Sequence, residues 1–113
     1  MIVAFSVAPS GGPVPVDGEP DSVSAAVADA VLVVRSSGLP HRTDSMFTTI
    51  EGDWDECMDV VKRATEAVAR HGTRVSLVLK ADVRPGRTGE MTGKLERLEA
   101  AVERAQGEAG RGQ

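Results

Sequence analysis

The stretch "TDSMFTTIEGDWDE", Thr43 to Glu56, decides the fold expected for this chain. Its second half carries the start of a helix, because Asp53 can act as the N-cap and Glu56, three residues later, completes a capping box. A helix is therefore expected from Asp53 to about His71. Before it, the chain is extended in pattern and ends on an acid, Glu51, which is followed by a glycine. Glu51 is thus a charged residue at a strand end, with no part in starting the helix that follows.

The segments on either side of this helix have strand patterns. His41 to Glu51 is expected to form two short strands that turn near Ser45 to Phe47. After Gly72, "RVSLVLKADV" alternates and predicts a strand whose apolar face is made of Val75, Leu77, Leu79, Ala81 and Val83. The helix between these segments repeats its inward-facing residues at helical spacing: Trp54, Cys57, Met58, Val61, Ala64, Thr65 and Val68.

The N-terminal part of the chain predicts a strand and a helix joined by a long loop. Ile2 to Ala8 has a strand composition, and Pro9 to Pro20 is rich in proline and glycine. This loop is either a flexible lid or a tolerated surface insertion. The helix that follows, with Asp21 or Ser22 as its cap, is expected to place one set of residues on a single face: Val23, Val27, Ala30, Val31 and Val34.

The C-terminal part predicts one more helix and a tail. Leu95, Leu98 and Val102 lie at helical spacing and indicate a last, short amphipathic helix. The glycine-rich residues 107–113 are expected to fray, so the chain divides into a single domain at 1–106 and a flexible C-terminal tail.

The order of these elements predicts an α+β fold. Strand, helix, two short strands, helix and strand give βαββαβ, the ferredoxin-like sandwich, with an additional C-terminal helix. A three-stranded sheet is the alternative if His41 to Glu51 does not split into two strands. In the first strand Val3, Phe5 and Val7 lie on one side, and Ile2 and Ala4 lie on the other, so both faces of the sheet need burial. A second chain is the simplest cover, and we expect a homo-oligomer. The alternative is that Ile2 and Ala4 are merely peripheral.

Composition excludes several classes of protein. The 13 basic and 17 acidic residues give a net charge of -4 without a basic stripe, which argues against a nonspecific nucleic-acid binder. The single Cys57 excludes an internal disulfide, and no Cys/His cluster has zinc spacing. The apolar residues at the N-terminus lack the features of a signal peptide or a membrane span, so we expect a cytoplasmic protein.

Glu51 is the strongest candidate for a binding role. A carboxylate at a strand end can be simply solvated, but it can also accept a hydrogen bond from an amino group or balance a cationic ligand. Thr48, Thr49 and Met46 would flank it with hydroxyls and a thioether. Trp54, at the start of the helix, either packs in the core or against an oligomer partner, or stacks on a ligand ring.

Four quoted stretches carry a resemblance to a known family: "SVSAAVADAV", "TDSMFTTIEGDWDECMDVVKRATEAVARHG", "KADVRPGR" and "MTGKLERL". Together they make the chain resemble the small thiamine-binding proteins related to YkoF, from Ile2 to about Ala105. The most specific element is Met46-x-Thr48-x-Ile50-Glu51-Gly52.

The resemblance implies a ferredoxin-like fold assembled as a dimer of dimers, a homotetramer, with thiamine or its hydroxymethylpyrimidine moiety held near subunit interfaces. It implies ligand contacts from Glu51, Thr48 and Met46. Ser6 and Ser45 are added because they are polar residues on strands or turns.

Three functions remain open at this stage. The first is noncatalytic binding of thiamine or its pyrimidine for scavenging, storage or delivery, without a cofactor or metal. The second is a structural or regulatory homo-oligomer with a vestigial pocket and a protein partner. The third is an enzyme in which Glu51 acts as a general base.

Overall fold

A computed structural model describes residues 1–11, 24–86 and 89–111 of the chain, with the backbone alone for 108–111. Along the chain it contains β1 (Ile2–Ser10), α1 (Ser24–Ser36), β2 (His41–Thr43), β3 (Thr48–Glu51), α2 (Trp54–Ala69), β4 (Arg74–Asp82) and α3 (Glu90–Arg111). No helix in these ranges is both long enough and apolar enough to cross a membrane.

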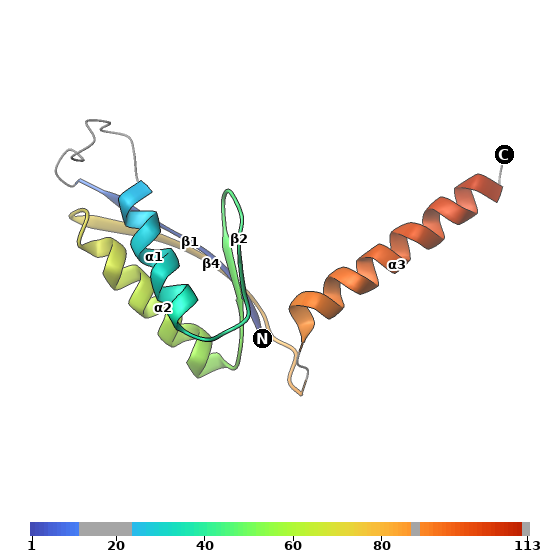
Figure 1. The fold of residues 1–113 in the computed structure, drawn as a ribbon, viewed down its shortest axis with the longest axis horizontal. Coiled ribbons are helices and arrows are strands. Elements are labelled where there is room, and N and C mark those ends of the chain that lie inside the picture. Colours follow the sequence, from blue (N-terminus) through green and yellow to red (C-terminus); the bar gives the residue numbers. More distant parts are fainter. Residues whose placement is uncertain (12–23, 87–88, 112–113) are drawn as a thin grey trace.

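The four strands form one antiparallel sheet in the order β2-β3-β1-β4. Helices α1 and α2 lie side by side on one face of this sheet, here called the helix face (Figure 1). The other face is called the outer face. This is the predicted ferredoxin-like βαββαβ arrangement with an additional C-terminal helix. The two short strands expected between His41 and Glu51 are confirmed as β2 and β3.

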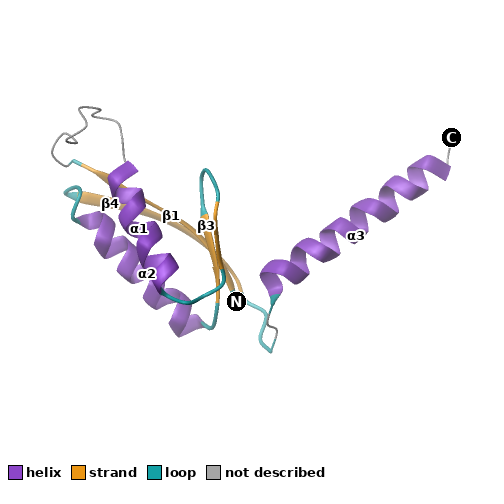
Figure 2. Ribbon diagram, in the orientation of Figure 1, coloured by secondary structure: helices purple, strands orange, loops and turns teal. Residues whose placement is uncertain are grey.

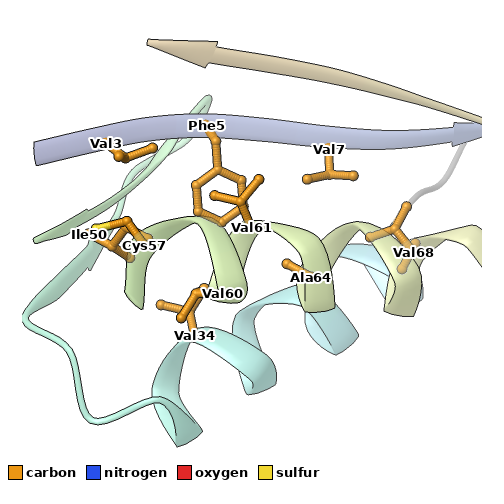
Figure 3. Close-up of a cluster of buried hydrophobic side chains, with 11 residues drawn as sticks. Val3, Phe5, Val7, Val34, Ile50, Cys57, Val60, Val61, Ala64 and Val68 are labelled. Atoms are coloured by element: carbon orange, nitrogen blue, oxygen red, sulfur yellow. The ribbon is translucent and has the colours of Figure 1, made fainter. Parts of the chain in front are cut away.

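The core fills the space between β1 and the two helices. Val3, Phe5 and Val7 point from β1 toward α2, and Val34 reaches the same cluster from α1 (Figure 3). The remaining buried members of the cluster are Ala26, Ile50, Cys57, Val60, Val61, Ala64 and Val68. Valine and alanine dominate because the chain has few aromatic residues, so the core is thin.

Helix α2 begins as its sequence predicts. The Asp53 side chain accepts a hydrogen bond from the backbone amide of Glu56 at 2.7 Å, and the Glu56 carboxylate accepts one from the amide of Asp53 at 3.1 Å. The capping box is therefore complete. The C-terminal end of α2 contacts α1, because Nε2 of His71, just after the helix, lies 2.6 Å from Oδ2 of Asp29.

The buried face of α1 differs from the predicted one. Ala26 and Val34 are buried, whereas Val27, expected on the inner face, is exposed. This helix is apolar on most sides, so periodicity alone does not select the face, and contact with the sheet and α2 does. The expected cap, Asp21 or Ser22, and Val23 lie outside the described residues.

The outer face carries the second set of β1 side chains. The register pairs Ile2 with Asp82, Ala4 with Lys80 and Ser6 with Val78, and residues directly opposite each other share a face. Ile2 and Ala4 are half-buried. The two-sided pattern of β1 is thus present in the structure.

Helix α3 departs furthest from expectation. It contains 22 residues and continues to Arg111, so the predicted short helix is wrong in length. It projects away from the sheet (Figure 2), and Leu95, Leu98 and Val102 are exposed along it. Strand β1 also runs further than expected, to Ser10, and the loop residues after Gly11 lie outside the described ranges.

Candidate ligand-binding cleft

A cleft of about 630 Å³ lies at the end of the sheet where β1 begins and β3 and β4 end. We call it the Glu51 cleft. It is lined by Met1, 39–40, 51–54, Glu56, 83–86 and Gly89. Ligand pockets of proteins have volumes of roughly 300–1,000 Å³, so the Glu51 cleft has the size of a small-molecule site.

Glu51 is a buried charged residue in this cleft, with only 8% of its surface exposed. Its Oε2 accepts a hydrogen bond from the amide of Glu90 at 2.6 Å, and its Oε1 accepts a longer one from the amide of Met91 at 3.4 Å. Both donors belong to the first turn of α3. A carboxylate beside the positive end of a helix dipole is a favourable arrangement of charge.

The carboxylate of Glu51 acts at the first turn of α3 in the place of an N-cap side chain. Gly89, which precedes it, has a φ of 68° and no side chain that can accept a hydrogen bond. The carbonyl of Gly89 accepts the amide of Gly93 at 2.9 Å, so the helix starts there. Glu51 therefore satisfies amides that an N-cap side chain normally satisfies.

A second buried carboxylate, that of Glu90, lies where the cleft meets the start of α3. Oε2 of Glu90 accepts a hydrogen bond from Nη2 of Arg97 at 2.8 Å and lies 3.7 Å from Nη1 of Arg84. Arg97 lies two turns along α3, and Arg84 lies in the segment between β4 and α3. Among the described residues, two acids and two arginines thus join the wall of the cleft to the start of α3.

Gly52 is closely packed at this point. A Cβ atom there would lie 3.3 Å from Cδ2 of Leu39 and 3.4 Å from Sγ of Cys57. Its φ is not in the left-handed region. The amide of Gly52 donates to the carbonyl of Met1 at 3.1 Å, which holds the end of β3 against the start of the chain.

Trp54 forms part of the cleft wall. It is the first residue of α2, directly after the N-cap Asp53, and it is 58% exposed. The structure therefore does not show this side chain packed in the core of its own chain. The exposed indole ring is free to stack on a flat ligand.

The side chains of the cleft carry an excess of negative charge. Among the described lining residues, three carboxylates, on Glu51, Asp53 and Glu56, face the guanidinium of Arg84 and the amino group of Met1. Asp53 and Glu56 are occupied by the capping box, so Glu51 is the carboxylate that is not committed to α2. The cleft is therefore suited to a cationic or hydrogen-bond-donating ligand.

Residues 3–99 match the family described as thiamine-binding protein. The chain belongs to this family. The resemblance expected from the sequence is thus confirmed, and it covers nearly the whole chain.

Individual relatives support the same assignment to the thiamine-binding family. The chain is 51% identical over 100 residues to a UPF0045 protein of Mycobacterium bovis, covering 88% of this chain and 91% of that protein. It is similar in structure to a hypothetical protein from Methanocaldococcus jannaschii, with a TM-score of 0.73, 30% identity, and coverage of 87% and 94% of the two chains. It is also similar to a Thermotoga maritima protein proposed for thiamine biosynthesis or salvage, with a TM-score of 0.64, 26% identity, and coverage of 83% and 96%.

The site residues expected from sequence lie at four separate places in this family member. Glu51 lies in the cleft. Ser45 and Met46 lie at the turn between β2 and β3, where Met46 is 76% exposed. Thr48 is opposite Phe5 on the helix face, and Ser6 is opposite Val78 on the outer face. A single chain does not bring these five residues together.

Other reactive side chains do not form a site in the described part of this thiamine-binding family member. Cys57 is buried beneath the cleft, and burial, which contributes most, raises the pKa of its thiol. A buried thiol with a raised pKa is a poor nucleophile. In the ranges that the structure describes, no group of three or more His, Cys, Asp or Glu side chains could hold a metal ion.

Proposed function

We propose that this protein binds thiamine or its hydroxymethylpyrimidine moiety in the Glu51 cleft, without catalysis, for scavenging, storage or delivery in the cytoplasm. The observation that carries the proposal is the pairing of a buried carboxylate, Glu51, with an exposed indole, Trp54, in one cleft of ligand size. Membership of the thiamine-binding family supports it.

The chemistry of thiamine matches these two groups. Its aminopyrimidine carries an exocyclic amino group that can donate a hydrogen bond, and its thiazolium is permanently cationic. A carboxylate has about four lone-pair sites, and the two α3 amides occupy one on each oxygen of Glu51. Glu51 can therefore accept from the ligand while it holds α3.

Trp54 supplies the second interaction. A cation over an indole ring is stabilised by roughly 0.5–2 kcal/mol, depending on how far it is desolvated. The ring also offers a flat surface for the pyrimidine. Because Trp54 takes no part in anchoring α3, its role in ligand binding can be tested separately from the fold.

The charges of the cleft favour ligands without phosphate. Arg84 supplies the guanidinium among the described lining residues, and it lies near Glu90 as well as among the cleft carboxylates. A diphosphate would bring negative charge next to Glu51, Asp53 and Glu56. We expect thiamine and hydroxymethylpyrimidine to bind more tightly than thiamine diphosphate.

We place the site at a subunit interface of a homo-oligomer, a dimer of dimers. This proposal is supported by the separation of the expected contact residues within one chain. Contacts from Ser45, Met46, Thr48 or Ser6 would then come from a neighbouring subunit, whereas Glu51 acts within its own cleft.

Calorimetric titration with thiamine, hydroxymethylpyrimidine and thiamine diphosphate tests the proposal. Trp54→Ala is expected to weaken thiamine binding about fivefold to thirtyfold, which corresponds to roughly 1–2 kcal/mol. The matched control is Leu32→Ala, an exposed apolar residue on α1 outside the cleft, which should leave affinity unchanged. Glu51→Gln should weaken binding further, and hydrogen exchange at the amides of Glu90 and Met91 reports whether α3 stays anchored in that variant.

The outcomes separate the proposal from its rivals. No saturable heat from any of the three ligands with the unmutated protein would overturn it. Chromatography of thiamine after prolonged incubation should return the ligand intact, and a new product would identify an enzyme instead.

The second candidate function, a structural or regulatory oligomer with a protein partner, is favoured by one observation. The apolar side chains of Leu95, Leu98 and Val102 are exposed on a helix that projects from the body. Such a stripe is suited to another protein surface. If Leu98→Asp abolished the function in cells while Trp54→Ala left it intact, this candidate would replace ligand binding.

A further inference from the structure

The orientation of the Glu51 side chain depends on α3. The backbone at this position is held independently, because the amide of Glu51 donates to the carbonyl of Pro40 at 3.0 Å. In the part of the chain that the structure describes, the hydrogen bonds to the carboxylate itself come from the amides of Glu90 and Met91, at 2.6 and 3.4 Å. The first turn of α3 therefore decides where the carboxylate points.

The position of α3 depends in turn on this carboxylate. Helix α3 projects away from the sheet (Figure 2), and among the elements in the described ranges it contacts β3, the strand that ends on Glu51, more than any other. The cations of the ion pairs that join α3 to β4 and to the segment after it, Lys94 and Arg84, are half exposed. Exposed ion pairs contribute little, whereas hydrogen bonds to a buried charged group contribute more. Glu51 is therefore the main anchor of the helix.

The carboxylate that anchors α3 also lines the ligand cleft. Residues 83–86 and Gly89, which lead into α3, line the same cleft as Glu51. A ligand in this cleft meets a carboxylate whose two oxygens are already placed by the helix. A glutamate side chain is among those that lose most conformational entropy when they are ordered. Binding to a carboxylate that is already ordered avoids this loss, so it is tighter.

The positive end of α3 has an opposing effect. A helix N-terminus carries roughly half an elementary positive charge, which reduces but does not cancel the attraction of the carboxylate for a cation. If α3 moved away, water would replace the two amides, and its high dielectric constant would weaken the same attraction. The carboxylate would then also be mobile. An anchored α3 therefore favours ligand binding.

We propose that the first turn of α3 positions Glu51 for the ligand, so that ligand binding and the anchoring of α3 stabilise each other. This inference rests on the proposed function, because it concerns the same cleft and the same ligands. The coupling is reciprocal: if an anchored α3 raises the affinity for the ligand, the ligand stabilises the anchor by the same factor. Glu90 is then a positioning residue that acts through its backbone amide.

The coupling transmits the state of the cleft to a helix outside it. Gly86 and Gly89, in the segment before α3, have φ values of 77° and 68°, and their Cβ positions face open space. Glycine adopts many backbone conformations at low cost, so this segment can act as a hinge. An occupied cleft holds the exposed apolar side chains of α3 in one position relative to the sheet, and an empty cleft holds them less firmly.

Hydrogen exchange of the unmutated chain tests the effect of the ligand on α3. Saturating thiamine or hydroxymethylpyrimidine should slow exchange at the amides of Gly93 and Lys94 by about fivefold or more. Neither residue is among the described residues that line the cleft, so direct shielding by the ligand does not account for the change. Amides in the second half of α2 are the control and should slow by less. Equal slowing in both helices would indicate general stabilisation and would overturn the inference.

Two variants of Glu90 test the effect of α3 on the ligand. Glu90 is the first residue of α3, where proline fits a helix, so Glu90→Pro removes the amide hydrogen without breaking the helix. Glu90→Ala is the matched control, because it also removes the carboxylate but keeps the amide. Calorimetric titration should show thiamine binding about fivefold or more weaker in Glu90→Pro than in Glu90→Ala. The ligand should slow exchange at Gly93 in Glu90→Ala but not in Glu90→Pro.

The outcomes separate this inference from the proposed function. Equal affinities in the two Glu90 variants, or ligand binding that leaves exchange at Gly93 and Lys94 unchanged, would overturn the coupling and leave the binding function intact. Absence of binding to the unmutated chain would overturn both. The exchange measurement uses the unmutated chain, so it decides the question even if Glu90→Pro does not fold.

Discussion

Helices α2 and α3 have similar sequence signals but different surroundings. Both repeat apolar residues at helical spacing. Helix α2 is capped by its own Asp53 and Glu56 and buries its apolar face against the sheet. Helix α3 is capped by Glu51, 39 residues earlier in the chain, and exposes its apolar side chains. Helices α1 and α2 cover the helix face of the sheet, and α3 projects away from it, so an amphipathic pattern predicts a helix but not its partner.

The largest expected difference between the two helices concerns stability. Phe5→Ala, which removes the ring that β1 packs against α2, should lower the free energy of unfolding by about 3–5 kcal/mol. Leu98→Ala on α3 should change it by less than about 0.5 kcal/mol within a single chain, because Leu98 is exposed. Urea unfolding measures both. A loss of several kcal/mol in Leu98→Ala would show that α3 is packed in solution.

The second-largest expected loss of stability concerns the hydrogen bonds from the first turn of α3 to Glu51. Glu51→Ala removes the acceptor of two amides, one of them at a buried position, and should cost about 1–3 kcal/mol. Hydrogen exchange should accelerate in the first turn of α3 and stay unchanged in α2. Glu96→Ala removes an exposed carboxylate from α3 and serves as the control. If Glu90 and Met91 exchanged at the unmutated rate in Glu51→Ala, the anchor would be absent in solution.

Removal of the N-cap of α2 should lower the free energy of unfolding by less than removal of the Glu51 carboxylate. Asp53→Ala removes the acceptor for the amide of Glu56 and should lower the free energy of unfolding by about 1 kcal/mol. Asp53→Asn, which keeps an acceptor oxygen, should retain most of that stability. Equal losses in the two variants would mean that charge, not capping, is what Asp53 contributes.

The smallest expected effect concerns the interaction between Asp82 of β4 and Lys94 of α3. The hydrogen bond from Lys94 holds the pKa of Asp82 below its usual range. A carboxylate whose pKa is lowered by folding stabilises the fold above its unfolded pKa, and this contribution is lost as pH falls through the lower folded pKa. Lys94→Gln should raise the pKa of Asp82 toward that of a free aspartate, about 3.9. Carboxyl NMR titration checks this, and an unchanged pKa would show that the pair does not persist in solution.

Features set by neighbouring residues were predictable from sequence. The capping box of α2 involves residues three apart, and the split of residues 41–51 into β2 and β3 follows from alternation and a turn. The order of the elements then gives the ferredoxin-like fold. Each of these features depends on backbone geometry within a few residues.

Features set by distant contacts were not predictable in the same way. The inner face of α1 was placed on Val27, because a helix that is apolar on most sides has no preferred face in its sequence. The glycines after Gln106 suggested the end of α3, but the helix continues to Arg111. No pattern in the sequence links Glu51 to the amides of Glu90 and Met91, which lie 39 and 40 residues later.

The candidate site was predictable in part. Glu51 was singled out because a carboxylate at a strand end had no local role, and the structure places it in the cleft. Met46 and Thr48 are near it in sequence, but the β2–β3 turn and the alternation of β3 carry them to other places. Trp54 has a helical spacing that fits a buried face, yet the first turn of α2 extends past the core and leaves its ring exposed.

The distant cap of α3 has a consequence for the order in which the chain folds. The capping box of α2 forms within four successive residues, so it is available as soon as that segment is synthesised. The cap of α3 requires closure of a 39-residue loop, and the entropy of loop closure opposes it until β3 has paired with β1. The first turn of α3 is therefore completed last. Protection of the Glu90 amide from hydrogen exchange during refolding would report the time at which the sheet is complete.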